Sequence, residues 1–127
     1  PLSVAAAAEN IRILRETDLI DHVVAMEGVL LDGLRTVQQR YPDVLGCLHG
    51  KGLVAGIQAV KKGTKTPDAA TALKINVTCF HKGLLMFAPV GYAGECIKIS
   101  PPLTITEEAL RESLDVFSEA CDEVLAE

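Results

Sequence analysis

The stretch from residue 83 to residue 106 constrains the fold more than any other part of the chain. An apolar run at 84–87 leads through a glycine-containing loop to a second apolar run at 96–100, and a double proline follows directly. Proline lacks the amide N–H that a β-ladder needs, so strand pairing must stop there. Thr106 then offers a hydroxyl cap to a helix whose first turn is acidic. The stretch therefore predicts two strands and a terminal helix in close succession.

Hydrophobic periodicity divides the whole chain into helices and strands. Apolar residues at three-to-four spacing indicate helices, and short runs rich in Val, Ile and Leu bounded by glycine indicate strands. We predict helices at about residues 3–16, 19–40, 68–82 and 106–125, and strands at about residues 44–48, 53–60, 84–87 and 96–100. The first two helices form either a hairpin or one element bent at Asp18.

These elements predict an α+β fold in which helices cover one short, mostly antiparallel sheet. Strands that alternate with helices and return by hairpins are typical of this class rather than of a doubly wound sheet. A chain of 127 residues fits one domain, spanning residues 1–127. Because only 4% of the residues are aromatic, Leu, Ile, Val and Ala must fill the core.

Charge and cysteine usage limit the classes of partner. The net charge of −5 comes without a basic run, which argues against nucleic acid. The sequence shows no apolar stretch near the roughly 18 residues of a membrane span and no secretory leader pattern. The cysteines are scattered, without a C-x-x-C pair, at positions Cys47, Cys79, Cys96 and Cys121. We therefore expect free thiols in a soluble, cytoplasmic protein whose partners are small molecules or other proteins.

Lys98 is the residue that we single out as a candidate binding group. Alternation along 96–100 places Lys98 on the face opposite Ile97 and Ile99, directly before the double proline that fixes the following backbone. A cation held in this way could bind a carboxylate. The alternative is a solvated strand lysine.

The remaining candidate motifs favour structural roles over chemistry. Residues 50–52 (Gly-Lys-Gly) and 91–94 lack the spacing of phosphate-binding glycine loops, so both predict turns, with a functional loop at 88–95 as the alternative. His49 and His81 have no partners at the spacing of a catalytic triad. No lysine is marked by its neighbours as a Schiff-base nucleophile. We therefore predict no catalytic residue, no cofactor-binding residue and no metal ligand in this chain.

Four short motifs supply a family resemblance. They are Pro-Leu-Ser-Val-Ala-Ala at 1–6, His-Gly-Lys-Gly-Leu-Val-Ala-Gly-Ile at 49–57, Lys-Gly-Leu-Leu at 82–85 and Ile-Lys-Ile-Ser-Pro-Pro-Leu-Thr-Ile-Thr-Glu-Glu at 97–108. With these motifs in this order, the chain resembles the C-terminal small domain of a class III, pyridoxal-phosphate-dependent aminotransferase of fold type I. The resemblance implies an α/β-type small domain with a short antiparallel sheet covered by helices.

The resemblance also implies a set of partners. Such a domain packs on a large domain of the same polypeptide, whose lysine forms the internal aldimine with pyridoxal phosphate, and the family generally works as a homodimer. In many members an arginine near the substrate carboxylate aligns with Lys98, so the resemblance implies substrate binding at Lys98. Lysine offers a point charge instead of a bidentate fork, and His49 stands where arginine is common.

Two hypotheses follow. The first is that the chain, which begins at Pro1 without Met, is the C-terminal part of an aminotransferase that moves an amino group from an amino donor to a keto acid. It would be inactive alone, would bind no cofactor alone, and would expose apolar surface on its first helix. The second is a free-standing, non-catalytic α+β domain that binds a small ligand or assembles with partners through its sheet face and the loop at 91–94.

Overall fold

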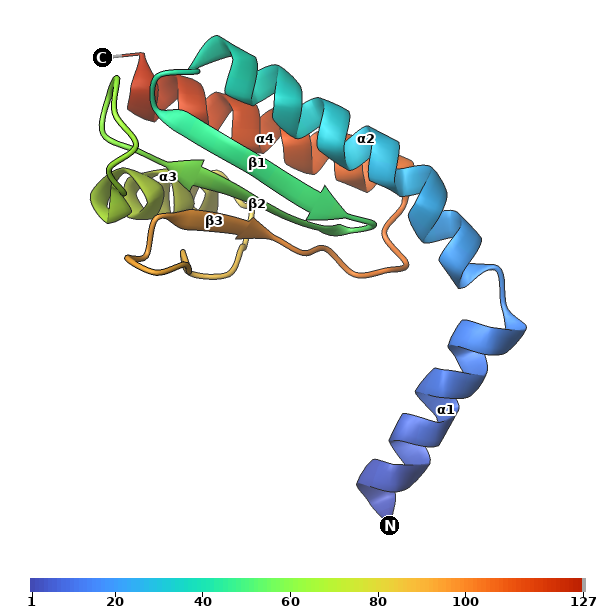
Figure 1. Ribbon diagram of the computed structural model, residues 1–127. Helices are drawn as coiled ribbons and strands as arrows, with labels where there is room; N and C mark the ends of the chain where they lie inside the picture. The colour runs from blue at the N-terminus through green and yellow to red at the C-terminus, as the bar shows by residue number, and fades with distance from the viewer. Residues whose placement is uncertain (127) are drawn as a thin grey trace.

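The computed structural model describes residues 1–126 and confirms the α+β class (Figure 1). Residue 127, the last of the predicted 1–127 domain, lies outside the described residues. The helices are α1 (Leu2–Glu16), α2 (Leu19–Arg40), α3 (Ala69–His81) and α4 (Glu107–Leu125), and the strands are β1 (Leu45–Lys51), β2 (Val54–Ala59) and β3 (Cys96–Ile99). Each helix begins and ends within one residue of its predicted bounds. The strand order is β1-β2-β3, with both pairings antiparallel.

The strand predicted at 84–87 is wrong. The segment follows α3 and its side chains alternate, with Leu84 and Met86 half-buried and Leu85 exposed. In the described part of the chain, however, no strand forms at these positions, and pairing of this region with β3 is limited to a bridge between Val90 and Cys96. Alternating burial reports that one face of a segment is covered, and it does not report whether a neighbouring backbone is within reach.

A two-residue turn joins β1 to β2. Lys51 pairs with Val54, and Gly52 at the first turn position has φ of 58°. A positive φ at this position matches a type II′ hairpin, which glycine adopts without steric cost. Helix α2 holds the turn through Glu27, whose carboxylate accepts the Gly52 N–H (2.7 Å) and pairs with Lys51 Nζ (3.0 Å). These contacts explain a carboxylate within the apolar stripe of α2.

The core lies between one face of the sheet and the helices. Ile57 of β2 and Ile97 of β3 are fully buried on this face, and Leu30, Leu34 and Phe117 reach it from α2 and α4. Figure 1 shows the three helices α2, α3 and α4 on the same side of the sheet. The opposite face of the sheet is left without a covering helix in residues 1–126, and we call it the open face.

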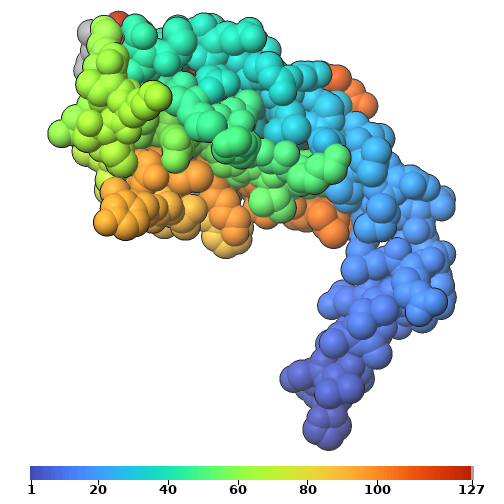
Figure 2. Space-filling model, viewed as in Figure 1, coloured from blue at the N-terminus to red at the C-terminus, as the bar shows by residue number. Residues whose placement is uncertain are grey.

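Helix α1 departs from the body of the molecule. Thr17 is extended (φ −124°, ψ 167°), which bends the chain before α2, so the two helices form the bent arrangement and not a hairpin. Figure 2 shows α1 as an arm that projects from the body. Its apolar side chains are largely exposed, among them Val4 (71%) and Ile11 (56%).

None of the helices in residues 1–126 combines the length and the apolar character that a bilayer span requires.

Candidate functional site

The open face carries a row of three residues that crosses all three strands. His49 of β1 pairs with Gly56 of β2, and Gly56 pairs with Lys98 of β3. Residues that lie directly opposite each other in an antiparallel ladder point to the same face. His49 and Lys98 therefore project from the open face on either side of Gly56. A methyl group added to Gly56 would meet Cys96 Sγ at 2.8 Å, so a side chain here would have to displace the Cys96 thiol. A shallow groove of ≈ 380 Å³ runs along this row.

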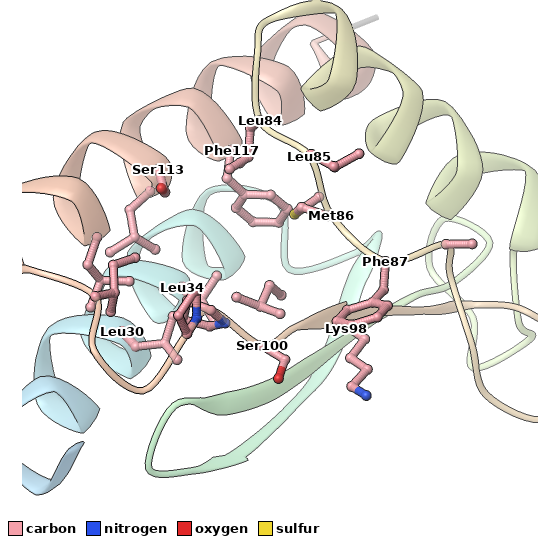
Figure 3. Close-up of a pocket in the computed structure, with 17 residues that line it drawn as sticks. Leu30, Leu34, Leu84, Leu85, Met86, Phe87, Lys98, Ser100, Ser113 and Phe117 are labelled. Atoms are coloured by element: carbon pink, nitrogen blue, oxygen red, sulfur yellow. The ribbon is translucent and has the colours of Figure 1, made fainter. Parts of the chain in front are cut away.

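Lys98 is placed on the open face, while its neighbour Ile97 is buried in the core. Its Nζ lies 4.8 Å from the centroid of the Phe87 ring, a cation–π contact with the extended segment after α3 (Figure 3). In residues 1–126 Lys98 forms no ion pair with a carboxylate. The side chain is therefore a half-buried cation whose ammonium group lies over the face of an aromatic ring.

An apolar pocket of ≈ 560 Å³ adjoins Lys98 on the other side of β3. It opens between α2, α4, the end of β3 and the extended segment at 84–88. Figure 3 shows Phe117, Met86 and Leu34 around this pocket. Ser113, one of its few polar groups, donates its hydroxyl to the Ala109 carbonyl (2.8 Å). Sequence reasoning missed the pocket because its walls come from segments far apart in the chain, and no local pattern reports such a meeting.

The four cysteines are in different environments. Burial raises the pKa of Cys79 to about 11 and that of Cys121 to about 12, and burial with the Glu95 charge raises the pKa of Cys96. Cys47 is exposed on β1, and its Sγ lies 2.9 Å from Nε2 of His49. In the described residues all four are free thiols.

The other candidate positions have structural partners. His22 is half-buried and its Nε2 lies 2.8 Å from the Ile105 carbonyl, a contact that joins α2 to the chain ahead of α4. In the loop at 91–94, Gly91 and Gly94 have positive φ values of 97° and 79°. The buried carboxylate of Glu95 accepts the Ala93 N–H there (2.8 Å). This geometry is that of a stabilised turn.

Comparison with known proteins gives one consistent result. The family model for "Aminotransferase class-III" matches residues 1–121. The chain is 32% identical over 124 residues to the 5-aminovalerate aminotransferase DavT of Pseudomonas putida, and 33% identical over 116 residues to a 4-aminobutyrate aminotransferase of Mycobacterium tuberculosis. These matches cover 98% and 91% of this chain but only 29% and 25% of the relatives.

Two further comparisons bear on fold and reaction. A solved structure titled "Transaminase with L-ala" superimposes with a TM-score of 0.84 and 25% identity, over 99% of this chain and 29% of that one. An alanine/serine racemase of Pyrococcus horikoshii is 29% identical over 125 residues, which are 98% of this chain and 26% of that protein. The chain thus spans between a quarter and a third of the length of these relatives.

Proposed function

The chain belongs to the class III aminotransferase family, and from this premise we propose that it is the C-terminal part of a pyridoxal-phosphate-dependent aminotransferase. The complete polypeptide would move an amino group from an amino donor to a keto acid. The match of the family model over residues 1–121 supports the proposal, as do relatives named for 5-aminovalerate and 4-aminobutyrate. Homodimer formation and a cytoplasmic location stay predictions.

The observation that carries the proposal at this site is the placement of Lys98. It is a cation on the open face, beside the groove over Gly56, and it has no carboxylate partner in the described residues. A substrate carboxylate would supply the missing counter-charge. Contact with the Phe87 ring restricts the lysine side chain, which lowers the entropic cost of holding it toward a ligand.

Pyridoxal phosphate supplies the electron sink for amino transfer when it is bound. A site for it needs a lysine in a shaped pocket and a cradle of amides or hydroxyls for the phosphate. The groove beside Lys98 is lined by His49, Lys51, Lys98, Cys96 and small or apolar residues, without a serine or threonine hydroxyl among these described residues. The groove therefore does not fit this cofactor, and we assign the cofactor to the large domain of the complete polypeptide.

The test is steady-state kinetics on the complete polypeptide that contains this chain. Lys98→Met keeps the length and apolar contacts of the stem and removes the charge, so we expect kcat/KM for the keto acid to fall by roughly 10–100-fold, the worth of a charge-assisted hydrogen bond. Lys98→Arg should retain most of the activity. Lys62→Met, in the exposed loop after β2, is the matched control and should leave the kinetics unchanged. Equal kinetics for Lys98→Met and the parent would remove Lys98 from substrate binding.

A second candidate function rests on the apolar pocket between α4 and the 84–88 segment. Its volume of ≈ 560 Å³ is within the range of small-molecule sites, about 300–1,000 Å³, which favours a free-standing ligand-binding domain. The exposed apolar residues of α1 instead favour a part of an aminotransferase, because exposed apolar surface of this kind marks an interaction site and a free-standing binding domain does not need one there. Sedimentation of the 127-residue chain distinguishes the two functions, because only the aminotransferase part should self-associate.

A further inference from the structure

The strands of the sheet are basic in a chain that is acidic overall. The net charge of the chain is −5, yet none of the residues in β1, β2 or β3 is an Asp or a Glu. The basic side chains of these strands are His49, Lys51 and Lys98, and all three line the groove on the open face. A cleft lined by charge of one sign concentrates counter-ions, so this groove favours an anionic ligand.

Two of these three basic groups are available to a ligand. Lys51 is already engaged, because its Nζ pairs with the Glu27 carboxylate at 3.0 Å. Lys98 has no carboxylate partner in the described residues. His49 is exposed, and its side chain contacts Cys47, whose Sγ lies 2.9 Å from Nε2. Lys98 and His49 are therefore the groups that can bind an anion in the groove.

The contact with Cys47 determines which nitrogen of His49 is a donor. When the thiol donates to Nε2, the imidazole proton lies on Nδ1. Within residues 1–126, Nδ1 has no hydrogen-bond partner. His49 therefore offers a ligand an N–H donor even when the ring is neutral, and it becomes a cation when it takes up a second proton.

The row of His49, Gly56 and Lys98 sets the size of a ligand that reaches both groups. Each member of the row pairs with the next across the sheet. Neighbouring strands lie about 4.8 Å apart, so the backbones of His49 and Lys98 are separated by about 10 Å. Gly56 has no side chain to fill the space between them, and the groove of ≈ 380 Å³ passes over it. A small molecule with an acidic group at each end fits this spacing, because both basic side chains rise from the same face.

We propose that His49 is a specificity-determining residue, which binds the second carboxylate of a dicarboxylic keto acid while Lys98 binds the first. The proposal rests on the proposed aminotransferase function and names the class of keto acid that this site prefers. A monocarboxylic keto acid uses Lys98 alone and leaves His49 in contact with water. The hydrogen bond from His49 is then made by one class of keto acid and not by the other, and this difference is the source of specificity.

The test is steady-state kinetics on the complete polypeptide that contains this chain, with 2-oxoglutarate as the dicarboxylic and pyruvate as the monocarboxylic keto acid. His49→Leu removes the donor, so we expect kcat/KM for 2-oxoglutarate to fall by about tenfold or more, and kcat/KM for pyruvate to stay within about twofold. His49→Gln keeps an N–H donor and should retain part of the activity toward 2-oxoglutarate. His81→Gln, a change of the exposed histidine at the end of α3, is the matched control and should change neither value.

The ratio of the two kcat/KM values separates the role of His49 from the function of the enzyme. A complete polypeptide that transaminates neither keto acid would overturn the proposed function itself. A polypeptide that transaminates, but in which His49→Leu leaves the ratio unchanged, would overturn the role of His49 and leave the proposed function standing. An equal fall for both keto acids is such an unchanged ratio, and it would assign His49 a structural role.

Discussion

At the scale of single residues, Glu27 shows how one carboxylate fixes the end of the sheet. Its two oxygens bind Lys51 Nζ and the Gly52 N–H, so α2 is joined to the turn between β1 and β2. The hydrogen bond to the Lys51 ammonium, then that to Gly52, lowers the pKa of Glu27 below its ordinary value of 4.5. A carboxyl whose pKa is lower in the folded than in the unfolded state stabilises the fold above the unfolded pKa.

The prediction for Glu27 concerns pH. Glu27→Gln should lower the urea midpoint of unfolding at neutral pH, and the difference from the parent should vanish as the pH falls through the lowered folded-state pKa, below 4.5. Urea titrations at neutral and acidic pH measure this. Glu112→Gln, at an exposed position of α4, is the control and should show no such pH-dependent difference. A difference for Glu27→Gln that persists at acidic pH would mean that charge is not its source.

Lys98 should matter for ligands and little for folding. Its cation–π contact with Phe87 is at a partly exposed site, so Lys98→Met should change the free energy of unfolding by about 1 kcal/mol or less. Urea unfolding of the 127-residue chain measures this. A loss of several kcal/mol would show that the kinetic effect expected for this variant reflects damage to the fold.

Single residues also show which contacts a sequence can report. The face that Lys98 occupies follows from the two-residue period of a strand, and the same period places Cys47 beside His49. The partners of Glu27 lie 24 and 25 positions away, and a helical stripe carries no information about them. The sequence therefore predicts orientation within an element well and contacts between elements poorly.

At the scale of elements, the helices could be predicted closely and the segment at 84–87 could not. A helix satisfies its own backbone hydrogen bonds, so a 3.6-residue period over 13 to 22 residues is enough to locate it. A strand needs a partner backbone, which lies outside its own sequence. At 84–87 the alternation reflects burial of Leu84 and Met86 beside the apolar pocket, and pairing with β3 stops at the Val90–Cys96 bridge.

Truncation to alanine should cost much more folding free energy in α4 than in the exposed 84–87 segment. Phe117 is 2% exposed in the core, so Phe117→Ala should lower the free energy of unfolding by about 3–5 kcal/mol. Leu85 is 80% exposed, and Leu85→Ala should change it by no more than about 0.5 kcal/mol. Chemical denaturation of both variants measures the contrast. A large loss in Leu85→Ala would mean that the segment packs as a strand after all.

At the scale of the whole molecule, the chain leaves two surfaces uncovered in residues 1–126. One is the open face of the sheet with Lys98, and the other is the apolar side of α1, where Val4 and Ile11 are exposed. An apolar helix that projects into solvent is typical of a surface that packs against another domain or chain. Both surfaces accord with a part of a larger enzyme, which the short coverage of the relatives also suggests.

The exposed arm gives a prediction about association. The 127-residue chain should self-associate through α1, and Ile11→Glu should shift it toward monomer because a charge then interrupts the apolar surface. Sedimentation velocity over a range of concentrations measures the effect. Gln39→Glu adds the same charge at an exposed position of α2 and should leave the association unchanged. A chain that is monomeric at every concentration would favour the free-standing binding domain.

We propose above all that this chain completes a pyridoxal-phosphate-dependent aminotransferase. The most direct measurement is the absorbance spectrum of the complete polypeptide that contains it, purified and scanned before and after borohydride and after an amino donor. We expect a Schiff-base band that borohydride removes and that an amino donor shifts. A complete polypeptide that shows no such band with added pyridoxal phosphate would contradict it, and the family fold would then serve binding alone.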